Sequence, residues 1–228
     1  MLYGEENVKS NIRNRGGKRV FYLGKEDALT PSARDWLQRE RIEILPAAQV
    51  KTSGFRLENG AVFAEKPEHF THLRGDILVP KTHPVIAFRG AMDTLQAQLL
   101  LTATAVPQNM VAAVRQLLDL ARKIIRWDVM EEPAQLDPLC GLTADEIRSH
   151  SHRPQDFYGI PHFMPEHTDG NAILQLNLAR CTARTAELAA VRAFTDDNGI
   201  CKREDLLQAL NRLSSALYIL MIQCKKES

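Results

Sequence analysis

An amphipathic helical stripe in the middle of the chain constrains the fold more than any other feature. Between Asn109 and Trp127, apolar residues recur every three or four positions, and an α-helix turns once in about 3.6 residues. The apolar side chains therefore share one face, which must be buried against other elements. The residues of this stripe are Val111, Val114, Leu117, Leu118, Ala121, Ile124 and Ile125.

Helical patterns on both sides of this stripe supply its packing partners. Continuous helical signals before it end ahead of Pro107, and a capping box of Thr143 and Glu146 opens a short helix after it. Because the connections are brief, we predict a mainly α protein built as an antiparallel four- or five-helix bundle. The long helices predicted around the stripe are Val85–Ala105, Asn171–Phe194 and Arg203–Gln223.

Residues 1–65 carry mixed signals instead. Thr30 and Pro31 are typical of a helix N-cap and a first helical position, and this helix should extend to about Arg41. Residues 1–18 are polar with no apolar period, so we expect them to be weakly ordered. We predict a small mixed α/β N-terminal extension at 1–65, followed by a helical-bundle domain at 66–228. The β-like runs of the extension are Val20–Leu23, Ile42–Leu45 and Ala61–Ala64, the last after a turn at Glu58-Asn59-Gly60.

Composition excludes several classes of function. The 29 lysines and arginines nearly balance the 28 aspartates and glutamates, so the chain lacks the basic surplus of a nucleic-acid-binding protein. No apolar run approaches the roughly 20 residues that a membrane-spanning helix needs. The spacing of Cys140, Cys181, Cys201 and Cys224 rules out a Cys-x-x-Cys site and indicates reduced thiols. We therefore expect a soluble, cytoplasmic protein with neither a nucleic-acid nor a membrane partner.

Charged residues on the helix predicted at 171–194 form the first candidate site. Arg180, Arg184 and Glu187 follow one another at helical spacing, so they project from one face. A solvated charged face is the plain interpretation. Leucines around much of the same helix leave few faces free, which favours arginines that point into a cleft. Two guanidinium groups in a cleft would suit a polyphosphate, since each can donate paired hydrogen bonds to phosphate oxygens.

Single polar residues on two other helices are further candidates. Asp93 lies in an otherwise apolar helix, where a buried carboxylate needs a partner such as an arginine from a neighbouring helix. A plain surface aspartate fits the segment equally well. Asn211 lies beside the core stripe of the last helix, where its amide could reach a cleft, although such an asparagine is also tolerated on a surface. That stripe is Leu206, Leu210, Leu213 and Leu217.

These segments, in this order, resemble the cobalamin adenosyltransferase family. The first bundle helix of the family carries Asp-Glu-Leu-Asn, which is similar to Asp93-Thr94-Leu95-Gln96. Its fourth helix carries Arg-x3-Arg-x2-Glu, which the two arginines and Glu187 match. Its last helix carries Leu-Asn-Arg-Leu-Ser-Asp-Tyr-Leu, matched from Leu210 to Ser214 before the two diverge at Ser215-Ala216.

The resemblance covers about residues 66–224. Upstream, Thr71-His72-Leu73-Arg74-Gly75 stands where the family has Thr-Arg-Ile-x-Gly. The ethanolamine-utilisation branch is favoured because its N-terminal extension resembles Leu29–Arg34 and its next segment resembles Lys66–Leu73. The implied activity is that of an ATP:cob(I)alamin adenosyltransferase, an enzyme in which Co(I) attacks the 5′ carbon of ATP and triphosphate leaves.

The resemblance also implies ligands and partners. The ligands are ATP as co-substrate, cobalamin and Mg²⁺. The partners are further copies of the chain, with a trimer favoured, together with an ethanolamine ammonia-lyase and a flavin reductase. The implied location is the cytoplasm or a bacterial microcompartment.

The site residues of the family are carried over position by position. Arg184, Arg180, Asp93 and Phe163 are the implied catalytic residues, and we expect Asp93 to pair with Arg180. Phe163 belongs to Pro161-His162-Phe163-Met164-Pro165, which is similar to the family's Phe-x-Leu-Pro. It is the implied aromatic beneath the corrin ring and, with Asp93, the implied cobalamin-binding residue. The implied ATP-binding residues are Thr71, Lys81, Arg180, Arg184, Glu187 and Asn211.

Two departures from the family pattern affect this assignment. The glycine-rich phosphate loop is replaced by Glu65–Phe70, which has no glycine, so phosphate binding should depend more on Lys81 and the two arginines. Some members of the branch carry His-x11-Cys-Cys-x2-Cys, a metal-binding signature. Counted from His69, the cysteine positions hold Lys81, Thr82 and Val85, so we predict no structural transition metal.

Two other classes of function remain open at this point. One is a non-enzymatic helical bundle that binds a corrinoid or a partner protein but not ATP. The other is a metal-binding protein, because imidazoles are common metal ligands and several histidines cluster in one irregular stretch. These are His150, His152, His162 and His167.

Overall fold

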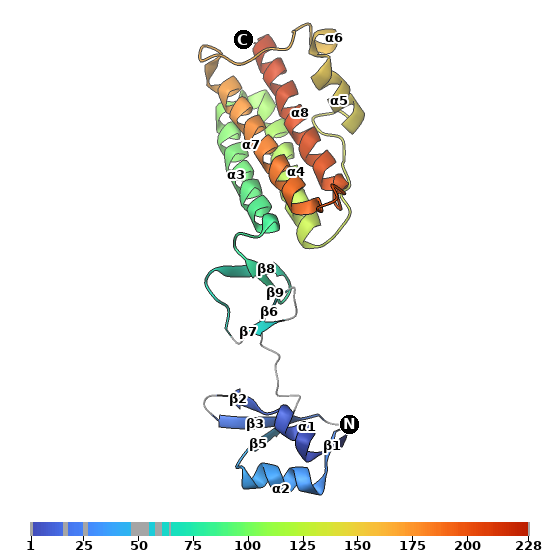
Figure 1. Ribbon diagram of the computed structural model, residues 1–228. Coiled ribbons are helices and arrows are strands. Elements are labelled where there is room, and N and C mark those ends of the chain that lie inside the picture. Colours follow the sequence, from blue (N-terminus) through green and yellow to red (C-terminus); the bar gives the residue numbers. More distant parts are fainter. Residues whose placement is uncertain are drawn as a thin grey trace. The chain divides into compact units, whose positions relative to one another are not determined.

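The computed structural model describes residues 2–15, 18–24, 27–46, 55–57, 61–63 and 65–227. The chain divides into two compact units, Met1–Arg56 with Gly60–Glu65 and Leu57–Asn59 with Lys66–Ser228 (Figure 1). The second unit contains the long helices. None of the helices in the described ranges combines the length and apolar character needed to cross a membrane.

Four long helices form the bundle of the second unit. α3 packs against α4 and α7, and α7 packs against α8. Neighbouring helices run in opposite directions (Figure 1), so the predicted mainly α antiparallel bundle is confirmed. The helices are α3 (Pro84–Ala105), α4 (Val111–Val129, after the 3-10 turn η2 at Gln108–Met110), α7 (Gly170–Phe194) and α8 (Glu204–Glu227).

Small side chains on α7 and large ones on its neighbours build the core. The alanines of α7 recur at helical spacing and are fully buried, and small contact residues let helix axes approach closely. The predicted stripe of α8 is confirmed, because its four leucines have no exposed surface. The buried alanines of α7 are Ala179, Ala183, Ala186 and Ala190.

Two short helices, α5 (Ala144–His152) and α6 (Pro154–Tyr158), pack against α8. The predicted capping box is confirmed: the Glu146 N–H donates to Thr143 Oγ1 at 3.3 Å and the Thr143 N–H donates to Glu146 Oε2 at 2.8 Å. The stretch that holds the four clustered histidines was predicted to be irregular, and this is wrong for its first part, which belongs to α5 and α6. Pro154 can open α6 because the first helical position needs no N–H donor.

A β-hairpin comes directly before α3. β8 (Phe70–Arg74) pairs antiparallel with β9 (Ile77–Pro80), and Gly75 takes the left-handed φ of 50° that the turn needs. The hairpin follows the glycine-free segment that replaces the family's phosphate loop. The arrangement places Thr71 in β8, opposite Val79 of β9.

A buried ion pair ties this hairpin to the bundle. Arg89 Nε donates to Asp128 Oδ2 at 2.7 Å, and Arg89 Nη1 donates to the Leu73 carbonyl at 2.9 Å. The Asp128 side chain has no exposed surface and that of Arg89 is 17% exposed. Because a buried carboxylate is costly without a cation, this pair joins α3, α4 and β8.

The first unit is a small mixed α/β structure around β3 (Lys18–Leu23). β3 pairs antiparallel with β2 (Arg13–Arg15) and parallel with β5 (Glu43–Pro46). β3 and β5 confirm the runs predicted at Val20–Leu23 and Ile42–Leu45, whereas β2 was not predicted. α2 (Pro31–Arg39) begins as predicted, with Thr30 Oγ1 accepting from the Ala33 N–H at 3.3 Å. It ends two residues before the predicted Arg41, which adopts a positive φ of 54°.

The prediction that residues 1–18 are weakly ordered is wrong for the described part of that segment. β1 (Leu2–Tyr3) pairs parallel with β4 (Ala28–Leu29), and α1 (Glu5–Ser10) follows it. Val8 of α1 is completely buried, and Lys9 lies over the Trp36 ring of α2. Farther along, β6 (Phe55–Leu57) pairs antiparallel with β7 (Val62–Phe63), inside the run predicted at Ala61–Ala64. The turn predicted at 58–60 and residue 64 lie outside the described residues.

Candidate functional site

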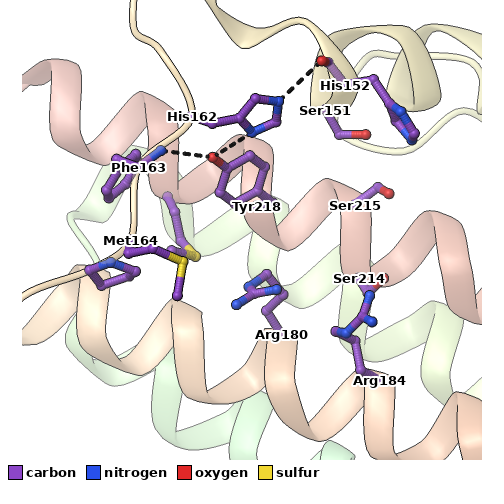
Figure 2. A pocket seen from close by; sticks show the side chains of 12 residues that line it. Ser151, His152, His162, Phe163, Met164, Arg180, Arg184, Ser214, Ser215 and Tyr218 are labelled. Atoms are coloured by element: carbon purple, nitrogen blue, oxygen red, sulfur yellow. Dashed lines mark hydrogen bonds between the residues drawn. The ribbon is translucent and has the colours of Figure 1, made fainter.

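A cavity of about 420 Å³ lies between the bundle and the loop that leads into α7. Its walls come from the end of α5, the loop after α6, the middle of α7 and the second half of α8 (Figure 2). The lining includes two predicted arginines and the predicted aromatic residue. The main polar and aromatic lining residues are His162, Phe163, Arg180, Arg184, Ser214 and Tyr218.

The two arginines lie one helical turn apart on α7 and both line this cavity (Figure 2). Arg180 is half-buried, and its Nε and Nη2 donate to Asn177 Oδ1 at 3.2 and 2.9 Å. Arg184 is exposed and forms no ion pair within the described part of the chain. Its guanidinium donors are therefore available to an anion that enters the cavity.

Tyr218 holds the loop that carries Phe163. The Phe163 N–H donates to the Tyr218 hydroxyl at 3.2 Å, and the same hydroxyl is 3.1 Å from His162 Nδ1. The two aromatic rings stack with centroids 6.2 Å apart and an angle of 29°. On its other side, the Tyr218 ring centroid is 6.0 Å from the Arg180 guanidinium. Tyr218 thus contacts both the aromatic and the basic part of the cavity (Figure 2).

Two further predicted residues contact each other beside the cavity. Asn211 Nδ2 donates to Glu187 Oε1 at 3.3 Å, and Asn211 Oδ1 accepts from Arg212 Nη1 at 2.8 Å. Arg212 is only 6% exposed, and its Nε has no partner among the described residues. Because both ends of the Asn211 amide are held, its orientation is defined before any ligand arrives.

The expected pair between Asp93 and Arg180 is not formed. Asp93 is exposed on α3, and Arg180 contacts Asn177 instead. The apolar residues around Asp93 in the sequence were misleading, because its helix neighbours Met92 and Leu95 face the core while Asp93 faces outward. The aspartate therefore corresponds to the surface alternative within a single chain.

The hairpin residues also lie outside the lining of the cavity. Thr71 is half-buried in β8, and Lys81 is exposed between β9 and α3, where its N–H donates to the His69 carbonyl at 2.9 Å. Both precede α3, whereas every lining residue lies between Ser151 and Met221. One chain therefore brings together Phe163, Arg180 and Arg184 but not the whole predicted set.

Sequence reasoning missed Tyr218, Ser214 and Ser215 as site residues. A signal for them was present, because positions 211, 214, 215 and 218 recur at the spacing of one helix face. Their selection needed the knowledge that this face of α8 borders a cavity. Ser214 is nearly buried there, at 5% exposure.

Metal-binding and thiol chemistry receive no support from the described residues. They contain no group of three histidine, cysteine, aspartate or glutamate side chains arranged to hold a metal ion. None of the four cysteines, all of which the structure describes, forms a disulfide. Burial raises the pKa of the Cys140 thiol to about 11, so this residue is protonated near neutral pH.

Comparisons of the sequence with known proteins show its family. A sequence model of the cobalamin adenosyltransferase family matches residues 62–224. The corrinoid adenosyltransferase EutT of Salmonella typhimurium is 33% identical over 225 residues, which cover 89% of this chain and 84% of that protein. EutT proteins of two Escherichia coli strains are 33% identical over 162 residues, covering 70% of this chain and 60% of each relative. Because the family match spans well over half of the sequence, the chain belongs to the cobalamin adenosyltransferase family.

Proposed function

We propose that this enzyme is an ATP:cob(I)alamin adenosyltransferase of the ethanolamine-utilisation type. In the proposed reaction, Co(I) of the corrinoid supplies an electron pair to the 5′ carbon of ATP. A cobalt–carbon bond forms, the bond between that carbon and the triphosphate oxygen breaks, and triphosphate leaves with the bonding electrons. The product is adenosylcobalamin.

The observation that carries the proposal is the meeting of two arginines and an aromatic loop residue in one cavity. Arg180 and Arg184 come from α7, and Phe163 comes from the loop across from them (Figure 2). Charge that builds on a departing triphosphate is stabilised by preorganised cationic donors. An apolar ring on the opposite wall suits a flat macrocycle that must be shielded from water.

This reaction requires the protein to position the two substrates and to stabilise the charge of the leaving group. It does not require proton transfer. Holding the 5′ carbon above the cobalt makes the attack effectively unimolecular. We assign Arg184 to the leaving triphosphate, because its guanidinium is exposed and unpaired among the described residues. Arg180 supports it from a fixed place, since Asn177 holds two of its donors.

We assign Phe163 to the lower face of the corrin ring. Co(II) is hard to reduce while its lower axial ligand remains bound, and an aromatic side chain in that place displaces the ligand. Phe163 suits this role because it is only half-buried and packs on the edge of the bundle core. Asn211 and Glu187 are assigned to ATP, with the amide already oriented by its two neighbours.

The predicted residues outside the cavity lead us to propose a homo-oligomer, with a trimer favoured by the family resemblance. Asp93 is exposed on α3, and Leu101, two helical turns farther, is 60% exposed. On α7, Leu188 follows Arg184 by one turn and is 64% exposed. Exposed leucines beside functional side chains are typical of an interface surface. A second chain covering this face would bring Asp93, Thr71 and Lys81 to the site of its neighbour.

Mg²⁺ belongs to the proposal as the companion of ATP. The described residues form no three-ligand metal group, so they do not fit a cage built by the protein alone. They fit an ion that takes most of its ligands from phosphates and water, as Mg²⁺ commonly does. Glu187 is the carboxylate nearest in sequence to the two arginines and is the residue we expect to face such an ion.

We further propose that the product serves ethanolamine catabolism in the cytoplasm or a bacterial microcompartment. The partners proposed for that setting are an ethanolamine ammonia-lyase, which would use the adenosylated cofactor, and a flavin reductase, which would supply electrons for Co(II). Both partners rest on the resemblance to the ethanolamine-utilisation branch.

An anaerobic assay of the purified protein with cob(I)alamin and MgATP tests the proposed function. We expect the visible spectrum of cob(I)alamin to convert to that of adenosylcobalamin, with one triphosphate released for each corrinoid converted. Corrinoid binding without conversion would support a non-enzymatic carrier instead. Neither binding nor conversion would overturn the assignment altogether.

A further inference from the structure

The Tyr218 hydroxyl stands at the centre of a hydrogen-bond chain with a defined direction. His162 Nε2 lies 3.1 Å from the His152 carbonyl, and a carbonyl only accepts, so Nε2 must carry a proton. In the neutral ring Nδ1 is then an acceptor, and the Tyr218 O–H donates to it across 3.1 Å. The lone pairs of the same oxygen accept the Phe163 N–H at 3.2 Å.

These hydrogen bonds fix the loop at residues 160–165, in which Phe163 also packs against the bundle core and has its ring centroid 5.9 Å from Lys225 Nζ. The described residues 160–165 form no backbone-to-backbone hydrogen bond with the described part of the chain. The Tyr218 ring also stacks on both neighbours, with centroids 5.7 Å from His162 and 6.2 Å from Phe163. Tyr218 itself is carried by α8 (Figure 2), a long helix whose core leucines are fully buried.

We propose that Tyr218 is a positioning residue that holds Phe163 at the corrinoid face of the cavity. The proposal rests on the proposed function, since it concerns the face on which that function places the corrin ring. A rigid helix supplies the hydroxyl, and the hydroxyl sets both the backbone of Phe163 and the ring of His162. Without the hydroxyl, the backbone of Phe163 would no longer be held in place, and its side chain would no longer enter the cavity in a fixed orientation.

The contact between Arg180 and the Tyr218 ring decides which substitution of Tyr218 is the better test. The guanidinium lies 6.0 Å from the centroid of the Tyr218 ring, and a cation over an aromatic ring is attracted to it. Tyr218→Phe keeps this ring and removes only the hydroxyl. The substitution therefore separates the loop-positioning role from any role of the ring beside Arg180.

The test is Tyr218→Phe in the full-length protein, assayed from two starting oxidation states. From cob(II)alamin with a reductant, we expect turnover to fall roughly five- to tenfold, the effect of one lost hydrogen bond in a site of this kind. From chemically reduced cob(I)alamin, we expect kcat and the KM for ATP to stay within about twofold. Electron paramagnetic resonance of bound cob(II)alamin with ATP should show a smaller fraction without its lower axial ligand.

Tyr158→Phe is the matched control. Tyr158 also hydrogen-bonds a histidine, with its hydroxyl 2.9 Å from His150 Nδ1, but it does not line the cavity. It should leave both assays and the resonance spectrum unchanged. A double variant of Tyr218→Phe with Phe163→Ala should lose no more activity than Phe163→Ala alone, because both changes act through the same side chain.

Equal losses from cob(I)alamin and cob(II)alamin, or additive losses in the double variant, would overturn the positioning role. An unchanged cob(II)alamin reaction in Tyr218→Phe would overturn it as well. Failure of the proposed function looks different, because the unmodified protein would then form no adenosylcobalamin from cob(I)alamin at all.

Discussion

Arg184 is the residue on which the proposed chemistry depends most directly. Arg184→Ala should reduce kcat with cob(I)alamin by about 100-fold or more, because it removes a charged donor at the leaving group. The unfolding midpoint should hardly change, since the side chain is exposed and unpaired among the described residues. Arg192→Ala, a change of another arginine on α7 outside the cavity, is the control. Activity of Arg184→Ala within a few fold of the unmodified enzyme would contradict the assignment.

The effect of substituting Phe163 should depend on the oxidation state of the cobalt in the corrinoid substrate. Phe163→Ala is expected to lower turnover from cob(II)alamin by about tenfold or more while leaving the KM for ATP nearly unchanged. The reason is that the ring is assigned to the corrinoid, whereas the phosphates of ATP are assigned to the arginines. Steady-state kinetics with cob(I)alamin and with cob(II)alamin measures both quantities. An equal loss of cob(II)alamin turnover and of ATP affinity would contradict the role assigned to Phe163.

At the scale of residues, the sequence predicted which side chains share a helix face better than it predicted which side chains of different elements contact each other. Arg180 and Arg184 could be placed on one face because helical spacing is regular over a single element. The predicted pair of Asp93 and Arg180 is not formed within one chain, because that contact depends on the rotation of α3 against α7, which helical spacing does not fix. Tyr218 was missed for a related reason: a tyrosine in a last helix is ordinary until a loop distant in sequence is seen to bond its hydroxyl.

At the scale of elements, two of the ion pairs made by α4 should differ greatly in their contribution to stability. Asp128→Ala leaves Arg89 without its carboxylate in a buried place, which should cost roughly 3–5 kcal/mol of unfolding free energy. Glu132→Ala breaks the largely exposed pair with Arg126, 70% exposed on the arginine side, and should cost less than about 1 kcal/mol. Urea denaturation of both variants measures the difference, and similar costs would contradict it.

The long helices could be predicted from sequence because period, caps and prolines agreed with one another. α3, α5 and α7 begin within one residue of their expected positions, at Pro84, Ala144 and Gly170. The hairpin of β8 and β9 was not recognised from the sequence. α1 was missed because its burial depends on one residue, Val8, packing into a core formed by later segments.

At the scale of the whole molecule, the exposed leucines of α3 and α7 should control assembly. Leu178 is 50% exposed on α7, and Leu178→Asp should convert the proposed oligomer to a monomer. Activity should fall more than about tenfold with it, because Asp93, Thr71 and Lys81 would no longer reach a cavity. Sedimentation velocity measures the first effect and the cob(I)alamin assay the second.

A control for this experiment lies on another helix. Met130, at the end of α4, is 61% exposed, so Met130→Asp adds the same charge to an apolar surface position of a different element. It should leave both the sedimentation coefficient and the activity unchanged. A monomeric unmodified protein with full activity would exclude the interface and show that one chain completes the site.

The sequence positions of the cavity-lining residues determine when the cavity can form during protein synthesis. All of its lining residues fall between Ser151 and Met221, and Ser214, Ser215, Tyr218 and Met221 belong to α8. When α3 and α4 have emerged from the ribosome, none of the residues that line the cavity has therefore emerged yet. A nucleotide or corrinoid meets a finished pocket only after α8 has docked. Ligands of this site can thus protect the completed protein by mass action, but they give no help to the first bundle helices while the nascent chain emerges.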